Sequence, residues 1–310
     1  MKRIVVSGLL AAAIVLSACG DDAQSSSDSA PQSTAGVTPT QPADVTTTSV
    51  GAVARKIVSI SPTGTEMLYA IGAGDQVIAV DDQSDYPAEV RDKPHDLSGY
   101  QPNVEAIAAL KPDLVVIGDD STGISKQLDA LGLQTWVGEA ATSFDSVYEQ
   151  IEQLGAATGH VAEAERLVKQ MQAEINSTVA AAPKPTVPLT YYHELDNTYY
   201  SITENTFIGQ VYALFGLQSI ADFEEVSSDY PQLSAEAVIS ADPDFIFLAD
   251  GAFGESPETV AARPGWAALK AVTNGNVIVV DEDISSRWGP RIVDYIKAIA
   301  AAMDKAEVAG

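Results

Sequence analysis

The chain of 310 residues is long enough for two domains of ordinary size, and its composition, 46% hydrophobic and 19% charged, is typical of a globular protein. It carries 43 acidic residues against 17 basic ones, a formal net charge of −26 at pH 7. This balance argues against nucleic acid as a partner and against attachment to anionic membranes through a basic patch. A single cysteine, Cys19, rules out an intramolecular disulfide.

The N-terminus has the pattern of an export signal. Two basic residues, Lys2 and Arg3, precede an apolar run at 4–16, which leads into the tetrapeptide Leu-Ser-Ala-Cys ending at Cys19. This pattern predicts a signal peptide at residues 1–18, too short to span a membrane comfortably. Cys19 resembles the acylated cysteine of a bacterial lipobox, so we expect a lipid anchor there. An ordinary signal peptide with an incidental cysteine is the alternative.

Residues 19–54 are rich in Ser, Thr, Pro, Gln and Asp and show no apolar periodicity. A segment of this composition cannot bury enough apolar surface to fold, so it is predicted to be a disordered tether. Such a tether would let a folded body, starting near Arg55, reach away from the lipid anchor.

Residues 55–157 alternate short apolar runs with helical patterns, which predicts a first α/β lobe. Strands are expected at 56–61, 77–80 and 135–137, and helices at 65–71, around 125–131 and from 144 onward. Polar loops at 81–87 and 98–102 follow the second strand.

The longest periodic stretch is residues 158–182. Val161, Ala164, Val168, Met171 and Ile175 recur at steps of three and four, which is the spacing of one helical face. A helix of this length would run about 37 Å at 1.5 Å per residue. We therefore expect one long helix that joins two lobes.

Residues 183–310 predict a second α/β lobe. A strand at 189–194, a helix at 207–215 and a strand at 277–280 precede a loop at 281–290 and a final amphipathic helix. Because strands alternate with helices throughout, we expect parallel sheets in both lobes. Ligands of such sheets bind beyond the carboxyl ends of the strands.

One stretch of the chain occurs twice, at 103–120 and at 234–250. Both copies predict a polar N-cap, a short helix with an acid in its first turn, a Pro-Asp turn and a buried strand. Glu105 of the first copy aligns with Glu236 of the second. The helix dipole accounts for one such acid, at about 0.3–1 kcal/mol. Two acids at matched positions of two lobes indicate instead a pair of charged contacts to a partner with two-fold symmetry.

Signatures of catalysis are missing from the sequence. No serine lies in a G-x-S-x-G elbow, no Walker motif is present, and His193-Glu194 lacks the second histidine of H-E-x-x-H. The three histidines are far apart, so we expect no resident metal, with His193 plus carboxylates as the alternative. We therefore expect a non-enzymatic protein without a cofactor of its own.

Aromatic residues gather in the loops expected at the ligand mouth. Flat rings suit a bulky, partly apolar ligand. Basic residues are scarce, so Arg287 and Arg291 stand out; Arg287 would bind an anionic group of the ligand or neutralise the local acidic field. The candidate ligand contacts are Tyr86, Tyr100, Tyr192, His193, Tyr200, Arg287 and Trp288.

From 55 to 303 the chain resembles the substrate-binding proteins of ABC importers for vitamin B12, ferric siderophores and haem. The matching motifs are IVSISPTGTEMLYAIGAG, the SDYP loop, NVEAIAALKPDLVVI, YPQLSAEAV and SRWGPR. The resemblance implies two α/β lobes bridged by one rigid helix, with the ligand held between them. It also implies that Glu105 and Glu236 match the permease-docking glutamates of the family, which would meet arginines on the two membrane subunits.

Within that family the motifs point to more than one ligand. The SDYP loop and Tyr100 look like those of vitamin B12 binders, and the SRWGPR loop is shared with siderophore binders. Basic residues for a trianionic chelate are sparse, and haem would need an axial ligand such as Tyr86 or His193.

The function expected from the sequence is therefore that of a receptor. We expect a monomeric bacterial lipoprotein, anchored to the outer face of the cell membrane, that delivers a metal chelate to a permease dimer with its ATPase subunits. A ferric siderophore is slightly preferred over cobalamin or haem. The alternative of another class is a lipid-tethered adhesion or signalling protein.

Overall fold

The computed structural model of the chain describes residues 52–223 and 227–309, all within one compact unit. The predicted signal peptide, Cys19 and nearly all of the predicted tether lie outside the described residues. Those assignments therefore stay predictions, as do the predicted domain boundaries. Among the helices of the described ranges, none is both long and apolar enough to cross a membrane.

The N-terminal half contains a four-stranded parallel sheet with the order β2-β1-β3-β4. All residues of β1 and β3 are buried, as expected for central strands that are covered on both faces. The strands are β1 (Ile57–Ile60), β2 (Val77–Val80), β3 (Leu114–Ile117) and β4 (Thr135–Val137), and the helices are α1 (Pro62–Ala70), α2 (Val104–Ala109), α3 (Ile124–Ala130) and α4 (Phe144–Thr158).

The C-terminal half repeats this arrangement. Its four-stranded parallel sheet has the order β6-β5-β7-β8, so the first strand again lies between the second and the third. The strands are β5 (Leu189–Glu194), β6 (Leu217–Ser219), β7 (Phe245–Leu248) and β8 (Val277–Val279), and the helices are α6 (Phe207–Ala213), α7 (Ala235–Ala241), α8 (Pro257–Ala262), α9 (Lys270–Thr273) and α10 (Glu282–Ser286). The predicted α/β class with two parallel sheets is confirmed.

Short 3₁₀ turns lie in the connections of both halves. They are found at Gly74–Gln76, Ala88–Asp92, Ile220–Phe223, Gly251–Phe253 and Trp266–Ala268.

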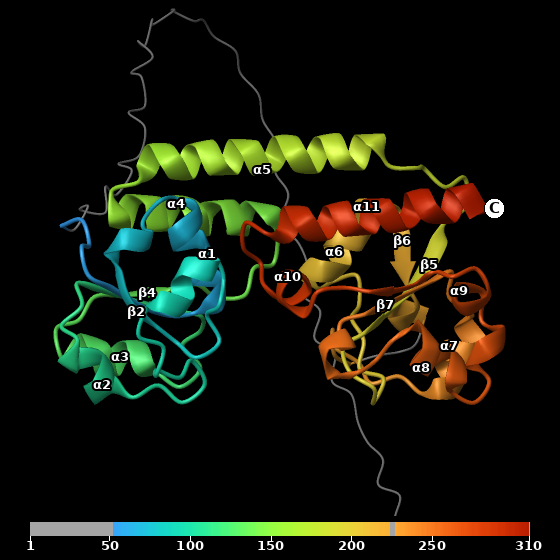
Figure 1. Cartoon of the computed structure of the whole chain (residues 1–310), viewed down its shortest axis with the longest axis horizontal. Coiled ribbons are helices and arrows are strands. Elements are labelled where there is room, and N and C mark those ends of the chain that lie inside the picture. The colour runs from blue at the N-terminus through green and yellow to red at the C-terminus, as the bar shows by residue number, and fades with distance from the viewer. Residues whose placement is uncertain (1–51, 224–226, 310) are drawn as a thin grey trace, which may run out of the picture. The chain divides into compact units, whose positions relative to one another are not determined.

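Helix α5 (Val161–Ala181) connects the two halves and packs on α4 and on the last helix, α11 (Ile292–Ala309). Figure 1 shows the three helices together along one side of the molecule. The predicted apolar stripe is the buried face of α5, since Ala164, Val168, Met171 and Ile175 are all buried. The helix begins later than predicted because Gly159 adopts a positive φ of 79° and ends α4.

The two copies of the repeated stretch fold alike. Each runs from a helix, α2 or α7, into a central strand, β3 or β7. The aspartates of the two Pro-Asp turns bind the start of the neighbouring strand. Asp113 accepts a hydrogen bond from the Arg55 backbone N–H (2.9 Å), and Asp244 accepts one from Thr190 N–H (2.8 Å). These carboxylates hold β1 and β5 in register with their neighbours.

Candidate functional site

A cavity with a volume of about 560 Å³ lies at the carboxyl ends of β1, β2 and β3. Small-molecule sites commonly have volumes of about 300–1,000 Å³. Residues 282–288, from α10 and the loop that follows it, close the cavity from the C-terminal side. We call this cavity the cleft. It lies where a parallel α/β sheet is expected to bind its ligand.

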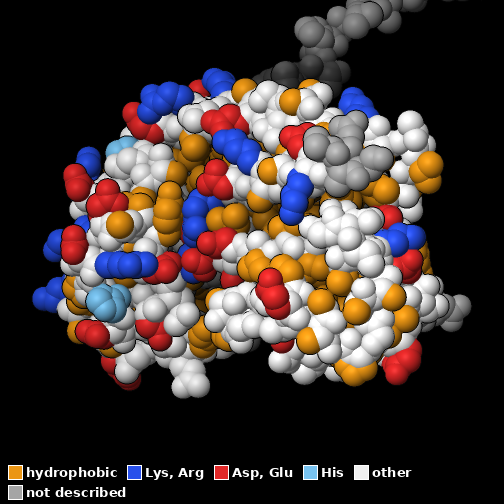
Figure 2. Space-filling model, turned by 45° about the vertical axis from the view of Figure 1, so that its right-hand side comes forward, with side chains coloured by type: hydrophobic (Ala, Val, Ile, Leu, Met, Phe, Trp, Pro, Cys, Tyr) orange, Lys and Arg blue, Asp and Glu red, His pale blue; other side chains and the backbone are white. Residues whose placement is uncertain are grey.

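Both walls of the cleft carry carboxyl groups. Asp81 and Asp119 follow β2 and β3, while Glu282 and Asp283 come from α10. Hydrogen bonds from Ser121 hold the pKa of Asp119 below its ordinary value, so that carboxyl group is ionised at neutral pH. In the view of Figure 2, acidic and basic side chains gather at the hollow near the middle of the face that is shown.

The guanidinium of Arg287, which also lines the cleft, is surrounded by carboxylates. Its Nη1 lies 2.9 Å from Glu66 Oε1 and 3.2 Å from Asp85 Oδ1, and its Nη2 lies 2.5 Å from Asp283 Oδ1. Burial by itself lowers the pKa of Arg287, but the carboxylates outweigh it and raise the pKa above its ordinary value. Of its two expected roles, the geometry favours neutralisation of neighbouring acids.

Arg291 does not line the cleft; it pairs with the same buried glutamate. Its Nε lies 2.9 Å from Glu66 Oε2 and its Nη2 lies 2.5 Å from Glu66 Oε1. Its guanidinium also stacks over the ring of Tyr86, 4.2 Å from the centroid. Tyr86, which is 46% exposed, therefore lies beside this ion-pair cluster and not among the residues that line the cleft.

Three of the predicted ligand contacts do line the cleft: Tyr100, Arg287 and Trp288. Tyr100 is 82% exposed, so its ring is open to a ligand. Trp288 is held in place by a hydrogen bond from its Nε1 to Gln150 Oε1 (3.1 Å). An aromatic ring therefore stands on each wall of the cleft, one from the 98–102 loop and one from the segment before α11.

The structure corrects the expectation for Tyr192 and His193. Both are buried inside the C-terminal half, because β5 is covered on both faces and successive side chains point to opposite sides. Tyr192 packs edge-on against Trp266, with ring centroids 6.0 Å apart. His193 Nδ1 lies 2.9 Å from the Tyr212 hydroxyl, and burial lowers its pKa to about 3, so the ring is neutral at neutral pH. Neither side chain reaches the cleft.

Tyr200, 40% exposed, lies on the loop after β5, where its backbone forms an isolated bridge with Gln232. It does not line the cleft.

The aspartates of the cleft were not among the ligand contacts predicted from the sequence. Asp81 directly follows β2, and Asp119 lies two residues after the end of β3. Apolar runs that end in an aspartate were visible in the sequence and could have identified both. The loop expected at 281–290 also proved to contain α10, which begins where Asp281 Oδ1 accepts a hydrogen bond from Ile284 N–H (3.2 Å).

Glu105 and Glu236 occupy equivalent positions in the two halves. Each is exposed in the first turn of its helix. The side chains of Asn103 and Ser234 cap these helices by accepting hydrogen bonds from backbone N–H groups three residues on (2.9 and 3.0 Å). In Figure 1, α2 and α7 both lie on the side of the molecule away from α5.

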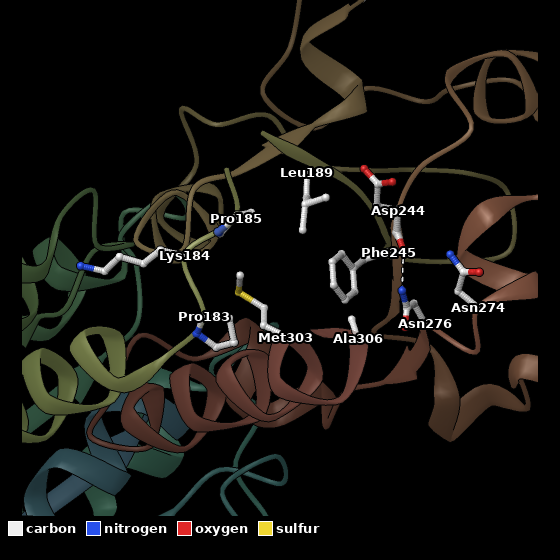
Figure 3. A pocket seen from close by; sticks show the side chains of 10 residues that line it. All are labelled: Pro183, Lys184, Pro185, Leu189, Asp244, Phe245, Asn274, Asn276, Met303 and Ala306. Atoms are coloured by element: carbon white, nitrogen blue, oxygen red, sulfur yellow. Dashed lines mark hydrogen bonds between the residues drawn. The ribbon is translucent and has the colours of Figure 1, made fainter. Parts of the chain in front are cut away.

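A second cavity, of about 270 Å³, lies at the amino ends of β5 and β7. Figure 3 shows Met303 and Ala306 of α11 facing Leu189 and Phe245 across it. Two of its lining residues bond to each other: Asn276 Nδ2 donates to the Asp244 backbone oxygen (3.1 Å). Its position at the opposite end of the sheet from the carboxyl ends of the strands favours a gap in packing over a ligand site. Within 52–223 and 227–309, no group of three or more His, Cys, Asp and Glu side chains is placed to hold a metal ion.

Comparison with known proteins identifies the family of the chain. The family described as periplasmic binding protein matches residues 57–284. An uncharacterised ABC transporter substrate-binding lipoprotein of Bacillus subtilis is 30% identical over 307 residues, which cover 95% of each chain. A cobalamin-binding protein of Halobacterium salinarum is 30% identical over 257 residues, 80% of this chain and 69% of its own. A vitamin B12-binding protein of Pectobacterium atrosepticum is 29% identical over 270 residues, 84% of this chain and 93% of its own.

Solved structures of similar fold are also periplasmic binding proteins, like the sequence relatives. The periplasmic vitamin B12-binding protein of Vibrio cholerae superposes with a TM-score of 0.68 at 25% identity and covers 82% of this chain and 98% of its own. A periplasmic haem-binding protein from Roseiflexus gives a TM-score of 0.72 at 25% identity and covers 81% and 99%. The chain belongs to the periplasmic binding protein family, whose members are non-enzymatic substrate-binding proteins of ABC transporters.

Proposed function

We propose that the protein is a lipid-anchored receptor that captures a corrinoid of the cobalamin type in the cleft and delivers it to an ABC importer. The family itself implies an extracytoplasmic location, a small-molecule ligand and a permease partner. The corrinoid, the lipid anchor and the docking residues are the parts of the proposal that go further.

The observation that carries the choice of ligand is the charge of the cleft. Four carboxyl groups line it, and its single lining guanidinium, Arg287, is already paired with Glu66 and Asp283. Among the described residues, no lining cation is therefore left to bind a carboxylate or a catecholate. A neutral chelate whose edge carries amide groups meets no such penalty. Relatives named as cobalamin-binding and vitamin B12-binding proteins agree with this choice.

A ferric siderophore, preferred from the sequence alone, is the second candidate in a restricted form. The acidic lining favours a neutral or cationic hydroxamate complex and opposes an anionic catecholate complex. Haem is disfavoured for the same reason, because its propionates are anionic. His193, one of the two expected axial ligands, is also buried away from the cleft.

Titration of the soluble protein tests the ligand. A fragment that begins at Gly51 contains every described residue and lacks the predicted anchor. We expect cyanocobalamin to bind saturably in a calorimeter, a ferric hydroxamate to bind more weakly, and haemin and a ferric catecholate to bind weakest. Tighter binding of haemin or the catecholate would overturn the choice of a corrinoid.

Uptake measurements test the proposed docking role of Glu105 and Glu236. Replacing both by alanine should abolish corrinoid uptake by cells and leave calorimetric affinity unchanged, because both residues lie outside the cleft. Glu258→Ala is the matched control: Glu258 is also exposed in the first turn of a capped helix, α8, in the C-terminal half. Normal uptake by the double variant would remove the docking proposal. If, in addition, the wild-type protein bound no chelate, the adhesion or signalling alternative would be favoured.

A further inference from the structure

Asp81 stands apart from the other acids of the cleft because it is buried and incompletely bonded. The residue is 1% exposed, and its Oδ1 has no hydrogen-bond partner among the described residues. Burial raises the pKa of this carboxyl group, although neighbouring Ser84 opposes the change. A buried acceptor without a donor is costly, by about 1–3 kcal/mol or more when it is charged. Hydrogen bonding from Ser84 offsets only part of that cost, because the pKa of Asp81 is still raised.

The surroundings of Asp81 are built around its carboxylate. The residue follows β2 and lines the cleft together with Gly99 of the 98–102 loop. A Cβ added to Gly99 would lie 2.8 Å from Asp81 Oδ2 and 3.2 Å from the Ile60 backbone oxygen. Only glycine lets this loop pass without displacing the carboxylate. The loop therefore packs closely against the Asp81 carboxylate where both residues border the cleft.

The matched acid of the cleft behaves differently. Asp119 follows β3 on the same wall, but it is exposed, and its Oδ1 already accepts a hydrogen bond from Ser121 N–H (2.8 Å). It is satisfied by its own loop and by solvent. The two carboxyl groups therefore differ in what they still require, although both line the same cavity.

We infer that Asp81 determines which ligands the cleft accepts, because its carboxylate receives a hydrogen bond from an N–H donor of the ligand. A peripheral amide of a corrinoid supplies such a donor, and so does the ammonium group of a cationic hydroxamate complex. A chelate whose edge presents only carboxylates offers none and is repelled. The inference rests on the function proposed above and adds a chemical reason for its selectivity.

Calorimetry on Asp81→Asn tests the inference with cyanocobalamin and haemin as probes. The substitution keeps the shape of the side chain and removes its negative charge. We expect cyanocobalamin to bind about fivefold to tenfold more weakly, since the new amide still accepts a hydrogen bond, but a bond to a charged group is worth about 1–1.5 kcal/mol more than a neutral one and 1.4 kcal/mol is a factor of ten. Haemin should bind as before or more tightly. The control Asp119→Asn should change the cyanocobalamin affinity less than threefold.

Gly99→Ala provides a second route to the same site. The added methyl group should displace the Asp81 carboxylate and lower cyanocobalamin affinity without removing any charge. Circular dichroism should show both variants folded. Equal losses for Asp81→Asn and Asp119→Asn, or parallel changes for both probes, would overturn the inference while the corrinoid function stands. A wild-type protein that binds no chelate would defeat both.

Discussion

Glu66 of α1 and Arg291, the residue before α11, form a two-point ion pair although they lie 225 positions apart in the chain. Glu66 is only 3% exposed, and its Oε1 also accepts a hydrogen bond from Nη1 of Arg287. One buried carboxylate thus holds two guanidinium groups and connects the segment before α11 to α1 of the N-terminal half. This pairing explains why the cation Arg291 lies just before α11, at a helix N-terminus where the helix dipole does not stabilise a positive charge.

Replacing Glu66 by glutamine should therefore destabilise the protein strongly. Two guanidinium groups would be left without their main counter-charge in a largely buried setting, and breaking a buried pair in this way costs about 3–5 kcal/mol. Chemical denaturation of the fragment that begins at Gly51 measures the change.

An exposed pair provides the control for this prediction. Lys297 Nζ lies 2.6 Å from Glu174 Oε2, with side chains 49% and 35% exposed. Lys297→Ala should cost no more than about 1 kcal/mol, because solvent screens such pairs. Similar costs for the two variants would show that the Glu66 cluster does not anchor the segment before α11.

Asp250, the residue that aligns with Asp119 in the repeat, should make stability depend on pH. It is 3% exposed, and neither of its carboxylate oxygens has a partner among the described residues. Burial, followed by the charge of Glu194, raises its pKa from 3.8 to about 7. The folded state therefore binds a proton that the unfolded state has released. Its contribution to stability is fully present below pH 3.8 and is lost as the pH rises through about 7.

Asp250→Asn should remove this dependence. At pH 8 the variant should be more stable than the wild type, and the difference should shrink by up to about 1.4 kcal/mol per pH unit between pH 7 and pH 5. Denaturation curves at pH 5, 6, 7 and 8 measure it. Asp119→Asn is the control: hydrogen bonds from Ser121 lower the pKa of Asp119, so its protonation does not change in this range. A stability difference for Asp250→Asn that is the same at every pH would contradict the prediction.

Most of the fold could be predicted because the local signals agreed with one another. Short apolar runs marked the central strands, and the three-and-four spacing of Val168, Met171 and Ile175 marked the buried face of α5. The repeat predicted two equivalent halves, and the structure gives both sheets the same strand order.

The side of a strand on which each residue lies could not be predicted in the same way. Because β5 is buried on both faces, its sequence shows no alternation that would separate ligand contacts from core residues. Tyr192 and His193 were therefore expected in the cleft and are found in the core. The pairing of Glu66 with Arg287 and Arg291 could not be predicted either, since no local pattern links residues more than 200 positions apart.

The predicted lipid anchor leads to a test of where the protein resides. Cys19 lies outside the described residues, and the chain as a whole carries 43 acidic residues against 17 basic ones. Such a protein is repelled by anionic headgroups, so charge cannot hold it at the membrane. Cys19→Ala should therefore move the protein from the membrane fraction to the soluble fraction. Cell fractionation followed by immunoblotting measures this shift.

The same experiment separates the anchor from the binding function. Cyanocobalamin affinity of the Cys19→Ala protein should equal that of the wild type, because the cleft lies wholly within the described residues. Cellular uptake should fall, since a receptor that diffuses away from its permease is diluted. A Cys19→Ala protein that still sediments with membranes would show that something other than acylation at Cys19 holds it there. In that case, retention by the permease could be tested by adding Glu105→Ala and Glu236→Ala to the same chain.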